Sequence, residues 1–135
     1  MEQALREELQ SRMSWENNPI CGTLKIYVDL IDDDRAEGHM DITHGCKNPG
    51  GYVHGGAIFT LCDSIGGLAV ISDGHRYVTQ SSSISFLGNQ QEGVIHASAE
   101  VLNRSKRTCL VRVSLTGDSG RKVAEAMLNF FRTDL

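Results

Sequence analysis

The first third of the chain carries one helical pattern of apolar residues and then two alternating patterns. Apolar residues spaced four apart, among glutamate and arginine residues, predict an amphipathic helix from Glu2 to Met13. The segments Leu24–Leu30 and Arg35–Ile42 both have apolar or small residues at even-numbered positions, which predicts half-buried strands with those positions facing inward. A run of aspartates at 32–34 separates the two segments, so we expect a hairpin with a solvated turn.

The middle of the chain has the period of a helix from Ala57 to Ile71. One side of this helix is an apolar stripe, expected to pack on a sheet, that comprises Ile58, Leu61, Cys62, Ile65 and Ala69. The opposite side carries Asp63, about 140° from the stripe on a helical wheel. Its other residues are Gly56, Phe59, Gly67 and Val70. A solvated face would carry lysine and glutamate, so we expect this side to meet a second copy of the chain.

Four alternating segments fill the rest of the chain. They are expected to be strands at Tyr77–Leu87, Val94–Leu102, Thr108–Thr116 and Lys122–Arg132, with turn-forming residues between them. The order helix, two strands, long helix and four strands predicts an α+β fold in which an antiparallel sheet covers the central helix. The length suits a single domain over residues 1–135, with the N-terminal helix within 1–15 and the core over 24–135.

Composition and charge argue against several classes of function. The net charge of −4 leaves no basic surface for nucleic acid or for an anionic membrane. The first residues lack the apolar core of a signal peptide. No apolar run approaches the roughly 20 residues that cross a bilayer. We therefore expect a cytoplasmic protein that binds neither nucleic acid nor membranes.

Metal and disulfide chemistry have little support in the sequence. The four cysteines are scattered without a CxxC pair, which argues against a zinc site and, in a reducing compartment, against disulfides. The aspartates at 32–34 lack the glycine and glutamate spacing of a calcium loop. Cys62 lies in the apolar stripe, and we expect a core thiol there rather than a reactive one. No metal and no cofactor are expected.

Asp63 is the one charged residue between His54 and Asp73, on a helix that is apolar nearly all round. Burial of a carboxylate is costly unless the group is paired or used. Two interpretations are open at this point. Asp63 makes a structural hydrogen bond, to nearby backbone or across a subunit contact, or it is a catalytic acid.

The motif at 54–56, a histidine followed by two glycines, stands at the start of the same helix. Backbone N–H groups are unpaired at a helix N-terminus, and glycine lets another molecule approach them. Such groups can hold a carbonyl oxygen that becomes an oxyanion. Gly55 and Asp63 lie about 12 Å apart along the helix, so one chain cannot use both on one carbonyl. A two-fold dimer with antiparallel central helices would form two composite sites.

A longer set of residues resembles the hotdog-fold thioesterases of the phenylacetic-acid-degradation (PaaI-like) group, which also includes the thioesterase superfamily member 2 type. The spacing of the asparagine, the HGG motif and the aspartate matches the family pattern. The segments that carry the resemblance are Asn48–Gly56, Leu61–Asp63, Val78–Thr79 and Ile84–Leu87. The resemblance implies a hotdog fold, in which a curved antiparallel sheet of about six strands wraps one long helix.

The resemblance also implies a role for each matching residue. Asp63 matches the acid that acts as general base or nucleophile, and Gly55 matches the glycine whose N–H polarises the thioester carbonyl. Asn48 matches a residue that positions water or the thioester, and His54 matches the motif histidine that supports this region. Thr79 matches the hydroxyl residue that assists the acid or its water. Family members form dimers, which often pair into tetramers.

Two departures from the family pattern affect the expected contacts with coenzyme A rather than the chemistry. The proline that often follows the Phe-Leu strand end is missing at 88–91, and Asn103 stands where relatives often have glycine. Arg104, Lys106 and Arg107 form a basic cluster in one turn, which either binds the phosphates of coenzyme A or is solvated.

The expected function is hydrolysis of an aryl- or medium-chain acyl-CoA to the free acid and coenzyme A. An alternative is a non-catalytic hotdog module that binds acyl-CoA as a sensor, although such a module has no need of a carboxylate near the thioester. A dehydratase or hydratase is a third possibility, but it would need a histidine paired with a carboxylate around the reacting carbons. The chain also lacks the G-x-S-x-G motif of α/β-hydrolases.

Overall fold

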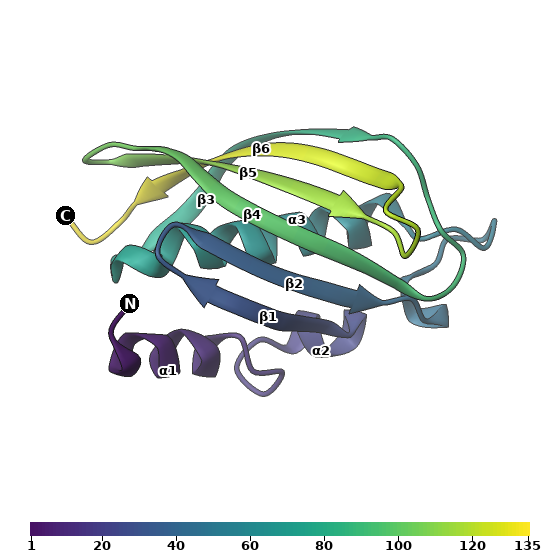
Figure 1. Ribbon diagram of the computed structural model, residues 1–135, viewed down its shortest axis with the longest axis horizontal. Helices are drawn as coiled ribbons and strands as arrows, with labels where there is room; N and C mark the ends of the chain where they lie inside the picture. The colour runs from purple at the N-terminus through teal and green to yellow at the C-terminus, as the bar shows by residue number, and fades with distance from the viewer.

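One long helix, α3 (Gly55–Val70), lies against a six-stranded antiparallel sheet in the computed structural model, which describes residues 1–135 (Figure 1). The sheet order is β1-β2-β4-β5-β6-β3. The strands are β1 (Ile26–Asp32), β2 (Arg35–Asp41), β3 (Tyr77–Phe86), β4 (Val94–Arg104), β5 (Thr108–Thr116) and β6 (Lys122–Arg132). The α+β architecture predicted from the apolar pattern is therefore confirmed.

Close packing between α3 and the sheet forms the core. All five residues of the predicted apolar stripe are buried. Two glycines allow the helix to lie close to the strands. A Cβ at Gly66 would be 2.9 Å from Cγ2 of Val113 on β5, and a Cβ at Gly38 on β2 would overlap the side chain of Ile65. The helix is therefore fixed relative to the sheet along the face opposite Asp63.

The N-terminal part of β1 differs from the prediction. Leu24 is not in the strand but ends a short helix, α2 (Pro19–Leu24), which the alternating pattern did not predict. The pairing of β1 with β2 shifts register between Val28 and Leu30. This bulge adds one residue and reverses the alternation after it, so Ile31 rather than Leu30 is fully buried.

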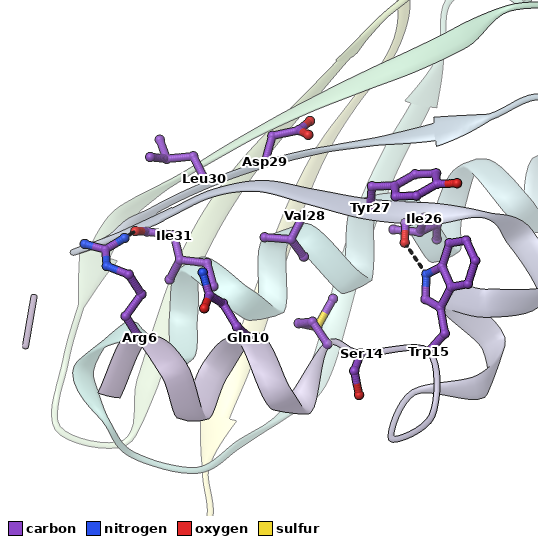
Figure 2. A pocket seen from close by; sticks show the side chains of 11 residues that line it. Arg6, Gln10, Ser14, Trp15, Ile26, Tyr27, Val28, Asp29, Leu30 and Ile31 are labelled. Carbon is purple, nitrogen blue, oxygen red and sulfur yellow. Dashed lines mark hydrogen bonds between the residues drawn. The ribbon is translucent and has the colours of Figure 1, made fainter. Parts of the chain in front are cut away.

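The N-terminal helix α1 (Gln3–Arg12) confirms the amphipathic prediction and lies along β1, an edge strand of the sheet (Figure 1). Figure 2 shows the contact from close by. The indole Nε1 of Trp15 donates a hydrogen bond to the Ile26 carbonyl at 2.7 Å, and the Arg6 guanidinium donates to the Ile31 carbonyl. Side chains from α1 and from the turn after it thus satisfy carbonyls of β1 that would otherwise leave this edge open to another strand.

The C-terminal end of α3 is enclosed by a network around Arg104. Its guanidinium donates to the Val70 carbonyl at 2.9 Å, to Asp73 Oδ2 at 2.8 Å and to Asp34 Oδ1 at 2.8 Å. Val70, predicted on the side of Asp63, is fully buried. The prediction was wrong because a 3-10 turn, η2 (Ile71–Asp73), follows the helix directly and the segments joined by Arg104 close over its end.

The expectation that no segment is long and apolar enough to span a membrane was also wrong. Residues Gly55–Asp73 form 19 helical residues that satisfy this test by length and composition. More than half of that stretch is buried inside the protein. A core helix covered by a sheet passes the same test, and the position of α3 under the six strands identifies it as one.

Replacing Arg104 should destabilise the fold, because three acceptors, two at the end of the long helix and one in the turn between β1 and β2, would lose a shared cationic donor. We expect Arg104→Lys to lower the free energy of unfolding by about 1.5–3 kcal/mol, since a lysine cannot reproduce the planar fork. Urea unfolding followed by circular dichroism measures this loss. Lys106→Ala, in the turn after β4, is the control and should stay within about 0.5 kcal/mol of the wild type. Equal stability of the two variants would contradict the structural role of Arg104.

Candidate active site

Asp63 lies at the centre of the most chemically distinctive part of the molecule. It is half-buried on α3, and its Oδ1 accepts a hydrogen bond from the Thr79 hydroxyl on β3 at 2.6 Å. No lysine, arginine or histidine of the chain pairs with the carboxylate, and no donor of the chain reaches Oδ2. One oxygen is therefore held in place while the other remains available to water or substrate. Thr79 therefore lies beside the acid, and its role in assisting the acid or its water stays a prediction.

The carboxylate opens onto a cavity of about 510 Å³. Most of the cavity wall is apolar and includes Ile20, Phe59, Leu68, Ile71, Val78 and Phe130. Residues of α2, α3, β3 and β6 all contribute to this wall. A carboxylate beside an apolar cavity of this size is the arrangement expected for a site that holds an organic substrate next to a base or nucleophile.

The N-terminus of α3 presents one unpaired backbone N–H group. The His54 side chain caps the helix, because its Nδ1 accepts the Gly56 N–H at 2.8 Å. The His54 carbonyl accepts the N–H groups of Ala57 and Ile58 at 2.9 and 3.1 Å. No acceptor of the chain takes the Gly55 N–H. His54 therefore satisfies its neighbours and leaves the Gly55 amide free to polarise a carbonyl.

Phe86, at the end of β3, lies beside this free amide. A Cβ at Gly55 would be 3.6 Å from two carbons of the Phe86 ring. That distance is an ordinary van der Waals contact, so the ring lines one side of this position without excluding a methyl group. Glycine places no side chain between the amide of the first helical turn and an approaching molecule.

Asn48 shapes the loop that precedes the helix. Its Oδ1 accepts the N–H groups of Gly50 and Tyr52 at 3.0 and 3.2 Å, and its side-chain amide nitrogen has no partner in the chain. Asn48 lines neither the cavity at Asp63 nor the one at His54. Its position in this loop is as the sequence predicts, whereas a role in holding water or the thioester stays a prediction.

Asn89 is a positioning residue that the sequence analysis missed. Its Nδ2 donates to the Val53 carbonyl at 3.0 Å, and its Oδ1 accepts the Val53 N–H at 3.0 Å. These bonds fix the residue just before His54 to the loop after β3, across 36 positions of sequence. Asn89 lies in the turn where the family proline is missing. This departure from the family pattern was the one sequence feature that pointed to Asn89.

A single chain does not bring the two halves of the expected site together. His54 and Gly56 line a second cavity of about 350 Å³, which does not include Asp63. The two cavities share only Ile20 and Thr60 among their lining residues. This separation agrees with the distance of about 12 Å expected from the helical rise.

The three basic residues assigned to coenzyme A differ in their surroundings. Arg104 is engaged with Asp34 and Asp73, so its guanidinium is occupied by contacts within the chain. Lys106 and Arg107 are exposed in the turn between β4 and β5. Of the three, these two are free to meet a phosphate, and the assignment of coenzyme A contacts stays a prediction for all three.

Neither the Cys62 thiol nor the cavity between α1 and β1 offers a catalytic group comparable to Asp63. Burial, together with the nearby charges of Asp63 and Glu125, raises the pKa of the Cys62 thiol to about 12. Cys62 therefore stays protonated at neutral pH, as expected for a core thiol. A cavity of about 540 Å³ between α1 and β1 holds only Arg6 and Asp29 as charged groups, and Arg6 is bonded to a strand carbonyl (Figure 2).

Solved structures of other proteins share the whole arrangement of helix and sheet. The PaaI protein from the phenylacetic acid degradation operon of Escherichia coli has a TM-score of 0.86 and 25% sequence identity, over 92% of this chain and 91% of that chain. A hypothetical thioesterase protein from Streptococcus pneumoniae, solved with coenzyme A, has a TM-score of 0.82 and 29% identity, over 89% of this chain and 97% of that chain. The expected hotdog fold is confirmed by these likenesses.

Sequence comparison points in the same direction. The 1,4-dihydroxy-2-naphthoyl-CoA hydrolase of Escherichia coli is 26% identical over 112 residues, which cover 81% of this chain and 82% of the relative. Residues 50–124, more than half of the chain, match the family described as the thioesterase superfamily. This match includes the HGG motif, Asp63 and Thr79, and the chain belongs to the thioesterase superfamily.

Proposed function

We propose that this protein is an acyl-CoA thioesterase that hydrolyses aryl- or medium-chain acyl-CoA to the free acid and coenzyme A. The observation that carries the proposal is the Asp63 carboxylate, which faces an apolar cavity with one oxygen held by Thr79 and no cationic partner. Membership of the thioesterase superfamily, a relative that hydrolyses a CoA thioester and a similar structure solved with coenzyme A support the choice of substrate.

In the proposed reaction, Asp63 either removes a proton from the water that attacks the thioester carbonyl or attacks that carbon itself. The Gly55 N–H donates to the carbonyl oxygen as it becomes negative, which contributes about 3–4 kcal/mol. The tetrahedral intermediate then breaks its C–S bond. The thiolate of coenzyme A leaves and takes up a proton. If water attacked, the acyl group is released directly as the free acid. If Asp63 attacked, the acyl group remains on Asp63 as a mixed anhydride, which a water molecule then hydrolyses to the free acid and the Asp63 carboxylate. A general base contributes roughly 10²–10⁴ to the rate.

The proposal requires a homodimer, because the free Gly55 amide and Asp63 are too far apart within one chain. The edge strand β3 carries Thr79, and most of its residues are exposed. Two copies that meet at this side would bring Gly55 of one to Asp63 of the other, and the symmetry would form two such sites. Pairing of dimers into a homotetramer, and a cytoplasmic location, are part of the same proposal.

The second candidate is a module that binds acyl-CoA without hydrolysing it. The same cavity would hold the acyl group in either case. The unpaired oxygen of Asp63 favours the enzyme, because a negative charge next to an apolar ligand weakens binding and has value only if it acts on water or on the thioester.

Asp63→Asn should abolish most of the turnover without preventing binding. The amide keeps the shape of the carboxylate but can neither accept the proton of water nor attack the carbonyl. We expect kcat to fall by roughly 10²–10⁴ in an assay of free thiol release from aryl- and medium-chain acyl-CoA. Binding of the same thioesters should persist. A wild type that binds them but releases no thiol above background would favour the sensor module.

Thr79→Val should lower kcat without changing the fold, because it removes the hydroxyl that holds Oδ1 of Asp63 and keeps the side-chain shape. A hydrogen bond to a charged group contributes about 1.5–3 kcal/mol, so we expect a loss of roughly 10- to 100-fold. Thr79→Ser restores the donor and serves as the matched variant. If serine and valine lower kcat equally, the hydroxyl is not what assists Asp63.

A further inference from the structure

One lysine lies in the wall of the second cavity, beside the start of α3. This cavity of about 350 Å³ is lined by α2, by residues 45–47 and by the first turns of α3. Lys47 is the one lysine among the lining residues, and no arginine, aspartate or glutamate lines the cavity. The rest of the wall is small, hydroxyl and apolar residues, together with Cys46 and His54. A cation in such surroundings is costly unless an anion pairs with it.

No group of the chain supplies that anion. The Lys47 side chain is half-buried, and its ammonium forms no ion pair within the chain. The two other titratable groups of the wall are already bonded. Nδ1 of His54 accepts the Gly56 N–H at 2.8 Å, and the Cys46 thiol donates to the Thr43 carbonyl at 3.2 Å. Lys47 is therefore the free charge of this cavity.

Backbone contacts fix the position of Lys47 relative to the helix start. Its N–H donates to the His44 carbonyl at 3.2 Å, and the residue pairs with Val53 in an isolated antiparallel bridge. Val53 directly precedes His54, which begins the cap of α3. The positive end of the helix lies at the same cavity, because His54 and Gly56 line it. The lysine and the helix start both favour an anion in this cavity.

The proposed reaction generates an anion at this place. In the proposed dimer, the Gly55 amide of one chain holds the thioester oxygen, and Asp63 of the partner subunit lies at the same carbonyl. The cavity at Asp63 takes the acyl group, so the sulfur extends from the carbonyl toward the second cavity of the chain that supplies Gly55. The sulfur is two bonds from the oxygen bound by Gly55, whose neighbours on both sides line that cavity. It becomes negative as the C–S bond breaks.

We propose that Lys47 is a further catalytic residue, whose ammonium stabilises the thiolate of coenzyme A as it leaves. This inference rests on the proposed thioesterase function. The electron pair of the C–S bond moves to sulfur, where the ammonium makes a charge-assisted contact with it. The thiolate then takes up a proton from the solvent, which receives the proton released when water adds to the acyl group. The need is greatest if Asp63 attacks directly, because that intermediate expels a carboxylate more readily than an unassisted thiolate.

Two competing partners would give Lys47 a different role. The phosphates of coenzyme A are anions on the same substrate, and a contact with them would improve binding without assisting the chemistry. Asp63 of the partner subunit is the other, and an ion pair with it would hold the pKa of that carboxyl down. The first role depends on the phosphates and the second alters the pH profile, whereas stabilisation of the thiolate depends on how basic the leaving thiolate is.

The test compares Lys47→Met with wild type on the octanoyl thioesters of coenzyme A, N-acetylcysteamine and thiophenol. The first two release alkyl thiolates, with and without phosphates, whereas thiophenol leaves as a weakly basic thiolate that needs no assistance. We expect Lys47→Met to lower kcat/KM roughly 10- to 100-fold on the coenzyme A and N-acetylcysteamine thioesters, the size of a contact with a charged group. Hydrolysis of the thiophenol ester should stay close to the wild-type rate.

Two further variants serve as controls. Lys47→Arg keeps the positive charge and should recover most of the lost activity. Lys122→Met removes an exposed lysine that pairs with Glu125 outside the site, and it should match wild type on all three thioesters. A loss confined to the coenzyme A thioester, an equal loss on all three thioesters, or a shift of the kcat/KM profile to higher pH in Lys47→Met would each overturn the proposal.

A binding measurement separates failure of this inference from failure of the proposed function. Coenzyme A itself is the product, and the ultraviolet absorbance of its thiolate reports ionisation of the bound thiol. The bound thiol should ionise about 1–2 pH units lower in wild type than in Lys47→Met, which corresponds to a 10- to 100-fold effect. If wild type hydrolyses no thioester but shows this shift, the thioesterase function fails and the Lys47 site stands. Equal ionisation in both proteins overturns the Lys47 site whatever the wild type hydrolyses.

Discussion

The burial of one face of α3 against the sheet is the constraint on which the rest of the molecule depends. Close contacts at Gly66 and Gly38 hold the helix in one position relative to β2 and β5. Once that face is fixed, the position of every other residue on the helix follows from its number. Asp63 lies on the side of the helix that faces the edge strand β3, where Thr79 binds it, and His54 caps the helix end that carries the free Gly55 amide. The candidate site is thus a consequence of helix packing.

Most of the secondary structure could be predicted from the sequence because its period is strong. The apolar stripe of α3 is buried as expected, and β5 and β6 begin and end at the predicted residues. Errors occurred where a local irregularity overrides the pattern. The bulge in β1 adds a residue that no alternation reveals, and it moves the buried position from Leu30 to Ile31. Val70 falls on the side of the helical wheel that was expected to meet a second copy, but the chain folds back over it.

The candidate site was predictable to the extent that its residues are close in sequence. Asp63 stands out as a lone charge in an apolar helix, and the HGG motif stands at a helix start. Contacts between segments that are distant in sequence could not be predicted from local patterns. Asn89 binds Val53 across 36 positions, and Arg104 joins Asp34 across 70 positions. The clustering of basic residues in the sequence suggested one common role for Arg104 and its neighbours. In the structure, Arg104 instead makes hydrogen bonds within the chain around the C-terminal end of α3.

The two edge strands of the sheet differ in whether side chains cover their outer backbone groups, and this difference limits how large an assembly could grow by strand addition. At β1, Trp15 and Arg6 occupy outward carbonyls, while β3 at the other end has no such cover. If a second molecule joined along β3, the outer edge of its sheet would be its own β1, whose carbonyls are likewise occupied by Trp15 and Arg6. Strand addition at β3 would therefore stop at two copies. A sheet with only one uncovered edge strand cannot extend into a fibre by this route.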